Sequence, residues 1–221
     1  MIVKKLNNPT AERFIIEAMG LIEEKNGSIG VNLREISKRV GCAHTNAYNY
    51  FESFTDLMWY AFDRTLEKYL NTIITGLDNK LSGYQYFKKL VNNLLRFALE
   101  NPGLYRFISS DPLDIKNIPE DVLQKVTKMK YYFIEVIMML TRNRIPKKDA
   151  ENVANIILSY LDGETFNLIN ERYLPEDKIE KRIVSNTILL FSKLTSTGSG
   201  NYSLKSNENK TSEFIFPTLE Q

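Results

Sequence analysis

The side chains best suited to chemistry in this 221-residue chain lie close together, between residues 32 and 50. Most are small amides and hydroxyls, which suit hydrogen bonding to the edges of DNA bases; Asn46 or Asn49 can pair with adenine through two hydrogen bonds. Nearby hydroxyls and cations can bind phosphates, contacts that position a protein on DNA. The candidate DNA-binding residues are Asn32, Arg34, Lys38, His44, Thr45, Asn46, Tyr48, Asn49 and Tyr50.

Two short helices joined by a tight turn are expected to position these residues. Asn32 is a good N-cap for the first helix, and Gly41 ends that helix. Residues 43–50 can form the second helix, with Ala47 and Phe51 facing the core. A helix-turn-helix places its second helix in the major groove of DNA. The spacing therefore predicts a DNA-reading unit.

The rest of the chain also has helical spacing. Apolar residues recur every three to four positions, and strand-type alternation bounded by hairpin turns is absent from the sequence. We therefore predict an all-α fold of about nine helices. Beyond the two short helices, the expected helices run from Pro9 to Asn26, from Ser53 to about Thr75, over 84–100, from Pro102 for a few turns, and over 119–142, 147–170 and 176–194.

The stretch from Gly27 to Leu57 resembles the DNA-binding domain of TetR-family transcriptional regulators. That family's pattern has a glycine before the first motif helix, a glycine turn, a tyrosine closing the recognition helix, and Phe and Leu at the exit. The matching residues here are Gly27, Asn32, Ile36, Ser37, Gly41, Cys42, Tyr48, Phe51 and Leu57.

Four residues depart from the family's pattern. One of them, Cys42, stands where valine is common, and we expect it to be a small core residue. Ser37 replaces the usual alanine, a change that a close helix crossing should tolerate. Ala43 stands where a Ser or Thr cap is usual, which predicts a weaker start for the recognition helix. Phe54 stands where the family has a phosphate-binding lysine. The absence of that lysine should weaken binding to any DNA sequence. It should also reduce the slope of log affinity against log salt concentration by about one.

The resemblance implies two domains, and the composition adds a tail. Residues 1–55 correspond to the TetR-type helix-turn-helix DNA-binding domain, and residues 56–194 to a helical ligand-binding and dimerisation domain. Residues 195–221 are polar and rich in Ser, Asn, Thr and Gly, so they cannot bury enough apolar area to offset the entropy of ordering. We expect a flexible polar C-terminal tail.

The resemblance also implies a mechanism. A homodimer would form through the last two helices, about 147–170 and 176–194, where Gly163 lets helices cross closely. Two recognition helices would read the half-sites of a pseudo-palindromic operator, about 34–36 Å apart. A small hydrophobic or amphipathic effector would then tilt the long helix from Ser53 and release a repressor from DNA.

Composition excludes several other classes of protein. The single cysteine, Cys42, rules out an internal disulfide, and the single histidine, His44, rules out a His-rich metal site. We expect no metal, no cofactor and no catalytic site, since the acids Asp162 and Glu164 lie two residues apart and do not face each other on a helix. No apolar run reaches the roughly 18 residues of a membrane span, so we expect a cytoplasmic protein.

Charge by itself does not point to nucleic acid. The net charge is +2, and residues 1–60 carry seven Lys or Arg against seven Asp or Glu. Three of these cations, Arg34, Lys38 and Arg39, cluster near the reading helix and can bind phosphates. Non-specific binding should therefore be modest, and specific contacts and dimerisation must supply much of the affinity.

Two alternatives remain open. The chain can be a TetR-like DNA-binding protein that acts without a small-molecule effector, in chromosome organisation or protein interaction. It can also be a helical ligand-binding bundle that has lost DNA binding, an alternative that Ala43 and Phe54 leave open. Aromatic residues in the helical domain can line an effector pocket or simply form the core: Trp59, Tyr60, Phe62, Tyr84, Tyr86, Phe87, Phe97, Tyr105, Phe107, Tyr131, Tyr132 and Phe133.

Overall fold

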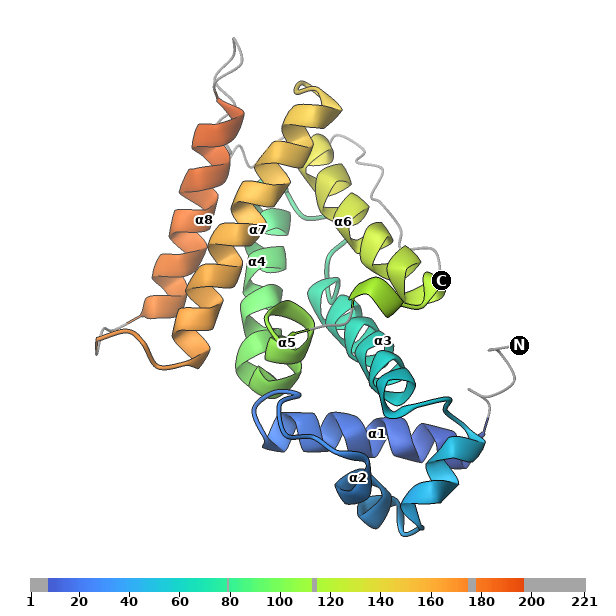
Figure 1. The fold of residues 1–221 in the computed structure, drawn as a ribbon. Coiled ribbons are helices and arrows are strands. Elements are labelled where there is room, and N and C mark those ends of the chain that lie inside the picture. The colour runs from blue at the N-terminus through green and yellow to red at the C-terminus, as the bar shows by residue number, and fades with distance from the viewer. Residues whose placement is uncertain (1–7, 79, 113–114, 175–177, 197–221) are drawn as a thin grey trace. The chain divides into compact units, whose positions relative to one another are not determined.

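The computed structural model describes residues 8–78, 80–112, 115–174 and 178–196. Over these residues the chain forms eight α-helices and two 3₁₀ helices and has no strand, which confirms the all-α prediction (Figure 1). No helix in the described ranges is both long and apolar enough to cross a membrane. The elements are α1 (Pro9–Glu24), α2 (Leu33–Val40), η1 (His44–Asn49), α3 (Phe54–Ile73), α4 (Gly83–Glu100), α5 (Pro102–Ser109), η2 (Ile115–Asn117), α6 (Glu120–Leu140), α7 (Lys147–Ile169) and α8 (Ile179–Thr195).

Local side chains start the two helices on either side of the reading unit. Asn8 caps α1: its Oδ1 accepts the N–H of Thr10 at 2.9 Å, and Pro9 occupies the first helical position. Ser53 caps α3: its Oγ accepts the N–H of Asp56 at 3.0 Å. Because both caps act within three residues, the sequence was sufficient to predict where these helices begin.

The first helix of the reading unit, α2, is closed at both ends by its own sequence. The Asn32 side chain accepts the N–H of Glu35 at 3.0 Å and donates to the Glu35 carboxylate at 3.0 Å. Asn32 thus caps one backbone N–H of the first turn, and the Glu35 carboxylate holds the Asn32 side chain in place. At the other end Gly41 adopts a left-handed conformation with φ of 83°, which a glycine allows without strain.

The second helix of the reading unit is a 3₁₀ helix. Ala43 occupies the N-cap position and offers no side-chain hydrogen bond. A short segment without a cap has little to stabilise a first α-helical turn, and 3₁₀ geometry is common in such short pieces. Ala47 and Phe51 are buried, with 1% and 3% of their surface exposed, as the sequence predicted.

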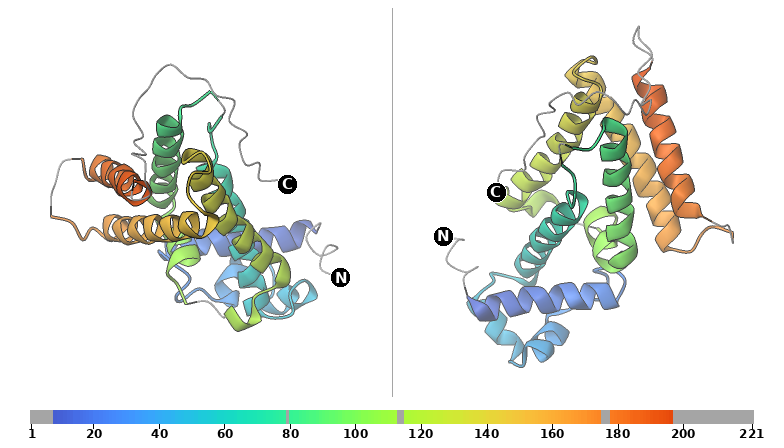
Figure 2. Two further views of the ribbon diagram at one scale, coloured as in Figure 1. Left: turned by 90° about the horizontal axis from the view of Figure 1, so that it is seen from above. Right: turned by 180° about the vertical axis from the view of Figure 1, so that it is seen from behind.

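The chain divides into two compact units, each with its own core. The first unit, Met1–Leu70 with Ala98–Val126, holds α1, α2, η1, α5 and most of α3. The second, Asn71–Phe97 with Thr127–Gln221, holds α7, α8 and most of α4 and α6. In the first unit α1 and α2 lie side by side, and in the second α7 and α8 do (Figures 1 and 2).

Within the first unit, α5 approaches the backbone of α1 closely. A Cβ atom added to Gly103 would lie 2.6 Å from the carbonyl oxygen of Ile22 and 2.7 Å from the Cα of Glu23, so only glycine fits there. The Glu23 carboxylate also accepts the N–H of Leu104 at 2.9 Å. The C-terminal end of α1 is therefore held by α5.

Candidate nucleic-acid interface

The exposed surface of α2 carries two stripes of different character. Residues four apart share a helix face, so Arg34 and Lys38 form one stripe and Glu35 and Arg39 form the other. All four side chains are exposed. Within the described part of the chain, both members of the second stripe are ion-paired, whereas neither Arg34 nor Lys38 has an ion pair.

The second stripe is tied to the end of α1. The Arg39 guanidinium donates to both carboxylate oxygens of Glu24, at 2.8 and 2.5 Å, and Lys25 Nζ lies 2.6 Å from the Glu35 carboxylate. The hydrogen bond from Arg39 lowers the pKa of Glu24 below its usual value. Arg39, which the sequence placed among the phosphate ligands, is therefore bound to Glu24. The cations that α2 presents outward are Arg34 and Lys38.

The reading helix η1 presents a polar surface. His44, Thr45, Tyr48 and Asn49 are exposed, and Asn46 is half-buried. The amide of Asn49 donates to the Asn46 Oδ1 at 2.7 Å, so the two candidate adenine readers orient each other. The structure thus brings all the predicted η1 residues together on one short element.

Two of the predicted site residues also have structural contacts. Asn32 caps α2 through its side chain. Tyr50 is half-buried, with its ring 6.3 Å from the ring of Phe14 and 6.4 Å from that of Phe51. Each of these two side chains therefore contributes to folding as well as to the candidate interface.

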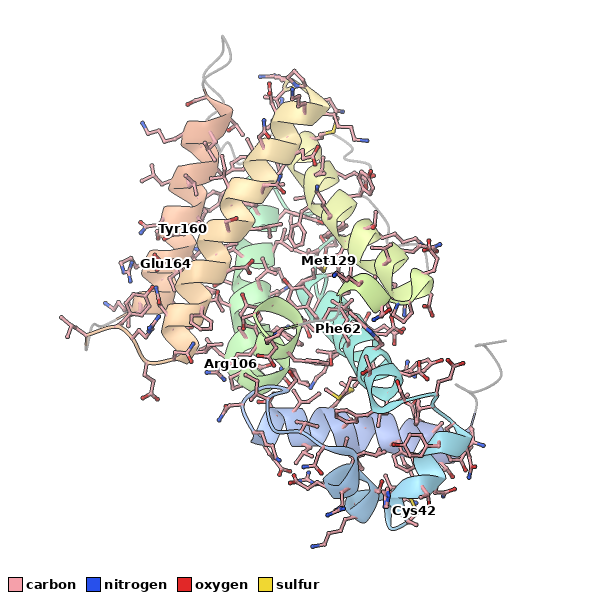
Figure 3. The ribbon with its side chains drawn as sticks, viewed as in Figure 1. Cys42, Phe62, Arg106, Met129, Tyr160 and Glu164 are labelled. Atoms are coloured by element: carbon pink, nitrogen blue, oxygen red, sulfur yellow. The ribbon has the colours of Figure 1, made fainter. Side chains whose placement is uncertain are left out.

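One contact at the turn could not be found by sequence reasoning. Arg13 Nη2 on α1 donates to the carbonyl oxygen of Val40, the last residue of α2, at 3.0 Å. A cation at a helix C-terminus also complements the helix dipole. The two residues are 27 positions apart, and no spacing rule connects them. The free thiol of Cys42 is half-buried in the same turn (Figure 3).

Helices α7 and α8 each leave a large apolar side chain exposed. Ile156 on α7 is 45% exposed and Leu189 on α8 is 56% exposed. Gly163, near Tyr160 and Glu164 on α7 (Figure 3), has no atom within 4 Å of an added Cβ, so the space beside it is open. Exposed apolar side chains and a glycine with open space beside it are features that a close helix crossing can use.

A small apolar cavity lies in the second unit, among α4, α6 and α7. Its volume is about 10 Å³, roughly the space of one water molecule. Phe87 and Phe133, from the aromatic set that the sequence singled out, are in its wall. Most of the other aromatic residues in that set are buried core residues. Among the described residues, no three His, Cys, Asp or Glu side chains are grouped so as to hold a metal ion.

Comparison with known proteins shows distant relatives. No protein-family model matches the chain. The nucleoid occlusion factor SlmA of Glaesserella parasuis is 24% identical over 165 residues, a match that covers 70% of this chain and 78% of that protein. SlmA of Haemophilus ducreyi is 22% identical over 172 residues, covering 74% of this chain and 84% of that protein.

Solved structures match over most of the chain. A TetR-family regulator from Streptomyces coelicolor superposes with a TM-score of 0.66 at 16% identity, covering 85% of this chain and 82% of that one. The fatty acid degradation regulator FadR from Bacillus halodurans has a TM-score of 0.62 at 14% identity, covering 87% and 98%. A transcriptional regulator from Rhodococcus has a TM-score of 0.65 at 16% identity, covering 83% and 96%. The chain therefore has the fold of the TetR-family transcriptional regulators, which confirms the resemblance seen between Gly27 and Leu57.

Proposed function

We propose that this protein is a homodimeric transcriptional repressor that reads a pseudo-palindromic operator through η1 and α2. The observation that carries the proposal is the polar surface of η1 beside the cationic stripe of α2. His44, Thr45, Asn46 and Asn49 would face bases. The proposed phosphate contacts are Arg34, Lys38, Tyr48, Tyr50 and, at the N-terminal end of α2, Asn32.

Each part of the chain has a role in this proposal. Residues 1–55 would bind DNA, and residues 56–194 would bind an effector and form the dimer through α7 and α8. The tail predicted for 195–221 lies, from residue 197 on, outside the described residues. As a DNA-binding regulator without catalysis, the protein would act in the cytoplasm.

An apolar or amphipathic effector is supported by how the cavity is connected to α3. The cavity wall includes Leu94 on α4. Its neighbour Asn93, also on α4, is 5% exposed and donates to the carbonyl oxygens of Ile73 at 2.9 Å and Thr75 at 3.0 Å, which close the C-terminal end of α3. An effector must enlarge a cavity of about 10 Å³, and a shift of α4 would then move the end of α3. Binding to that shifted state would lower DNA affinity.

A role without a small-molecule effector is the second candidate. The cavity is small, and the relatives found by sequence are called nucleoid occlusion factors, a name that refers to no small-molecule ligand. A thermal-shift screen of fatty acids and other amphipathic molecules separates the two candidates. A compound that raises the melting temperature and weakens operator binding supports the effector, whereas a screen with no such compound supports the second candidate.

DNA reading can be tested by selecting duplexes from a random-sequence pool with the wild-type protein. We expect enrichment of a two-fold symmetric sequence. Asn46→Ala should then weaken binding to it by about 1–3 kcal/mol and relax the preference at one base position in each half-site. Lys38→Ala should weaken binding to every duplex and reduce the salt slope by about one for each phosphate that Lys38 neutralises. Fluorescence anisotropy at several salt concentrations measures both effects.

Lys148→Ala on α7 is the matched control for Lys38→Ala, since it removes the same charge from an exposed position in the second unit. Its affinity and salt slope should equal those of the wild type. The proposal is wrong if no sequence is enriched, or if Asn46→Ala and Lys38→Ala behave as Lys148→Ala does.

A further inference from the structure

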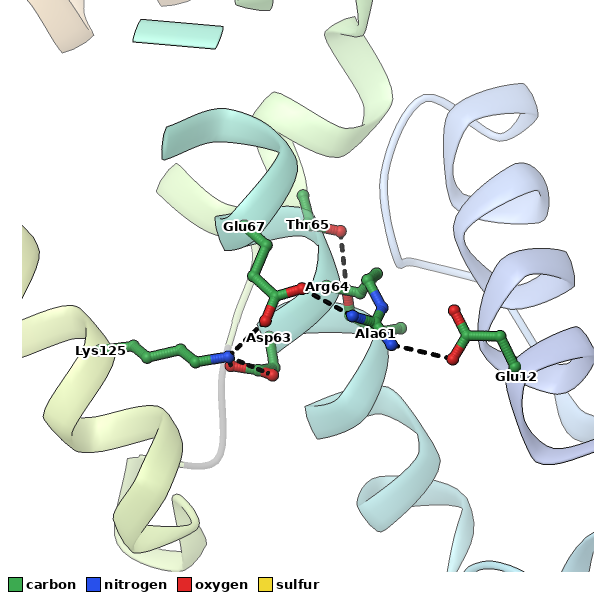
Figure 4. A network of polar contacts seen from close by, with 7 residues as sticks. All are labelled: Glu12, Ala61, Asp63, Arg64, Thr65, Glu67 and Lys125. Carbon is green, nitrogen blue, oxygen red and sulfur yellow. Dashed lines mark hydrogen bonds and ion pairs between the residues drawn. The ribbon is translucent and has the colours of Figure 1, made fainter. Parts of the chain in front are cut away.

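Five charged side chains from three helices form a continuous chain of contacts in the first unit (Figure 4). Lys125 Nζ on α6 lies 2.7 Å from a carboxylate oxygen of Asp63 and 2.7 Å from Glu67 Oε1, both on α3. Arg64, also on α3, donates to the other oxygen of Glu67 at 2.7 Å and to Glu12 on α1 at 2.9 Å. The contacts therefore run from α6 through α3 to α1.

Lys125 resolves a like-charge conflict on α3. Asp63 and Glu67 are four residues apart on one helix face, where two carboxylates repel each other. The Asp63 side chain is only 17% exposed, so the repulsion is less screened than in water. Burial raises the pKa of Asp63. Burial also acts to raise the pKa of Glu67, but hydrogen bonds from Lys125 and Arg64 bring it below its usual value.

Without Lys125, the charges of this group would rearrange around Arg64. The group holds three carboxylates and two cations, so no cation is in excess. Arg64 would become the only cation in the group close to Asp63 and Glu67 and would be drawn toward both. Its contact with Glu12 is the one that competes directly with that attraction. Removal of Lys125 should therefore loosen the attachment of α1 to α3.

The attached part of α1 is also the part that holds the turn of the reading unit. Glu12 is followed by Arg13, which donates to the carbonyl oxygen of Val40 at 3.0 Å. Val40 ends α2 and directly precedes the left-handed Gly41 of the turn. Three residues beyond that glycine, η1 begins at His44 without a side-chain cap. The turn that Arg13 holds therefore helps to place η1, together with the buried Ala47 of η1 itself.

We propose that Lys125 is a positioning residue for DNA binding, acting through Glu67, Arg64 and Glu12 on the turn that carries η1. This assignment rests on the proposed DNA-reading function. Lys125 touches no DNA in this scheme. It sets the population of η1 that is correctly placed to enter the major groove.

Affinity for the selected duplex is the first test. Lys125→Met and Glu12→Gln should each weaken binding about 3- to 10-fold, the range of coupling through packed networks. The double variant should bind no more weakly than the weaker single variant, because both changes break one path. The slope of log affinity against log salt concentration should remain that of the wild type. Lys125→Arg, which keeps the positive charge, should bind with wild-type affinity. Lys130→Met, on the same helix, is the matched control, since the exposed Lys130 pairs with Glu151 on α7 at 2.7 Å.

Amide hydrogen exchange of residues 41–49 in the free protein is the second test. Exchange should quicken in Lys125→Met and in the milder Glu12→Gln variant, and should not change in Lys130→Met. If exchange is faster in the two variants but the wild type shows no sequence-specific DNA binding, the proposed function is wrong. The path of contacts from Lys125 to the turn is then still supported. The assignment of Lys125 would be overturned by any of three results. These are wild-type exchange rates in both variants, losses of affinity that add in the double variant, or a salt slope of DNA binding reduced by about one in Lys125→Met.

Discussion

At the scale of single residues, charged side chains that are close in sequence make different contacts. Lys38 and Arg39 are adjacent in sequence, yet Lys38 is presented outward while Arg39 holds both oxygens of Glu24. Asp63 and Glu67 share one lysine, yet the pKa of Asp63 is raised and that of Glu67 is lowered. Residue type alone decides none of these outcomes, because each depends on burial and on which partner lies within hydrogen-bond distance.

The lowered pKa of Glu67 predicts how stability depends on pH. A carboxylate whose pKa is lower in the folded state stabilises that state above its usual value, here 4.5, and loses this effect as the pH falls through the folded value. Glu67→Gln should therefore destabilise the protein at pH 7, by less than about 1 kcal/mol because the group is partly exposed. The difference from the wild type should shrink below pH 4.5. Urea unfolding across the acidic range measures it.

Glu135→Gln provides the control, since Glu135 is exposed on α6 and the substitution removes the same charge. A gap between wild type and Glu67→Gln that stays constant from pH 7 down through the acidic range would contradict this account of Glu67.

At the scale of elements, α1 is held near both of its ends. Near its start, Glu12 accepts from Arg64 on α3. Near its end, Glu23 accepts from the backbone of α5 at Leu104, and Gly103 packs directly on the α1 backbone. Because α1 lies beside α2, these two attachments orient the reading unit. A short helix such as α2 depends on such packing for its stability.

Gly103→Ala should disturb the attachment at the end of α1. The new Cβ would meet backbone atoms at 2.6 and 2.7 Å, which cannot move independently of the helix. We expect a decrease of about 1–3 kcal/mol in unfolding free energy, typical of overpacking. Gly163→Ala is the matched substitution, because no atom lies within 4 Å of that Cβ. It should leave the isolated subunit's stability unchanged or raise it by about 0.5–1 kcal/mol.

Thermal and urea unfolding of the two alanine variants provide the measurement. If both substitutions shift stability in the same direction and by the same amount, the close approach of α5 to α1 does not constrain the fold as described.

At the scale of the whole molecule, the two units divide the proposed tasks. The first contains the reading elements α2 and η1, and the second contains α7 and α8. Residues 1–60 carry as many acidic as basic residues, and the chain lacks the lysine that the TetR pattern places at Phe54. One subunit should therefore hold DNA weakly, and two half-sites bound together would supply the missing affinity through a high effective concentration.

The dimer proposal predicts that the mass in solution rises with protein concentration, and that the exposed side chains of Ile156 and Leu189 are needed for this. Ile156→Glu with Leu189→Glu should raise the dimer dissociation constant more than about tenfold, because a buried charge without a partner is costly. Operator affinity should fall with it. Leu123→Glu on α6 is the control, since Leu123 is 41% exposed, close to the 45% of Ile156. Sedimentation equilibrium would contradict the interface if all variants gave the mass of the wild type.

The sequence by itself determined the features that depend on interactions within a few residues. The caps of Asn8, Asn32 and Ser53, the left-handed Gly41, and the buried Ala47 and Phe51 all follow from spacing that spans no more than a helical turn or two. The resemblance between Gly27 and Leu57 draws on the same local spacing. For this reason the all-α fold and the location of the reading unit could be predicted.

Only the tertiary structure decided which side chains are left to bind. Arg39 meets Glu24 across 15 residues, Arg13 meets Val40 across 27, and Lys125 meets Glu67 across 58. Likewise, the sequence does not distinguish Gly103, which lies against the backbone of α1, from Gly163, which has open space beside it. Helical periodicity specifies which face of a helix is apolar, but not which distant helix covers it. The partners of these charges and the space around these glycines are set when the helices pack together.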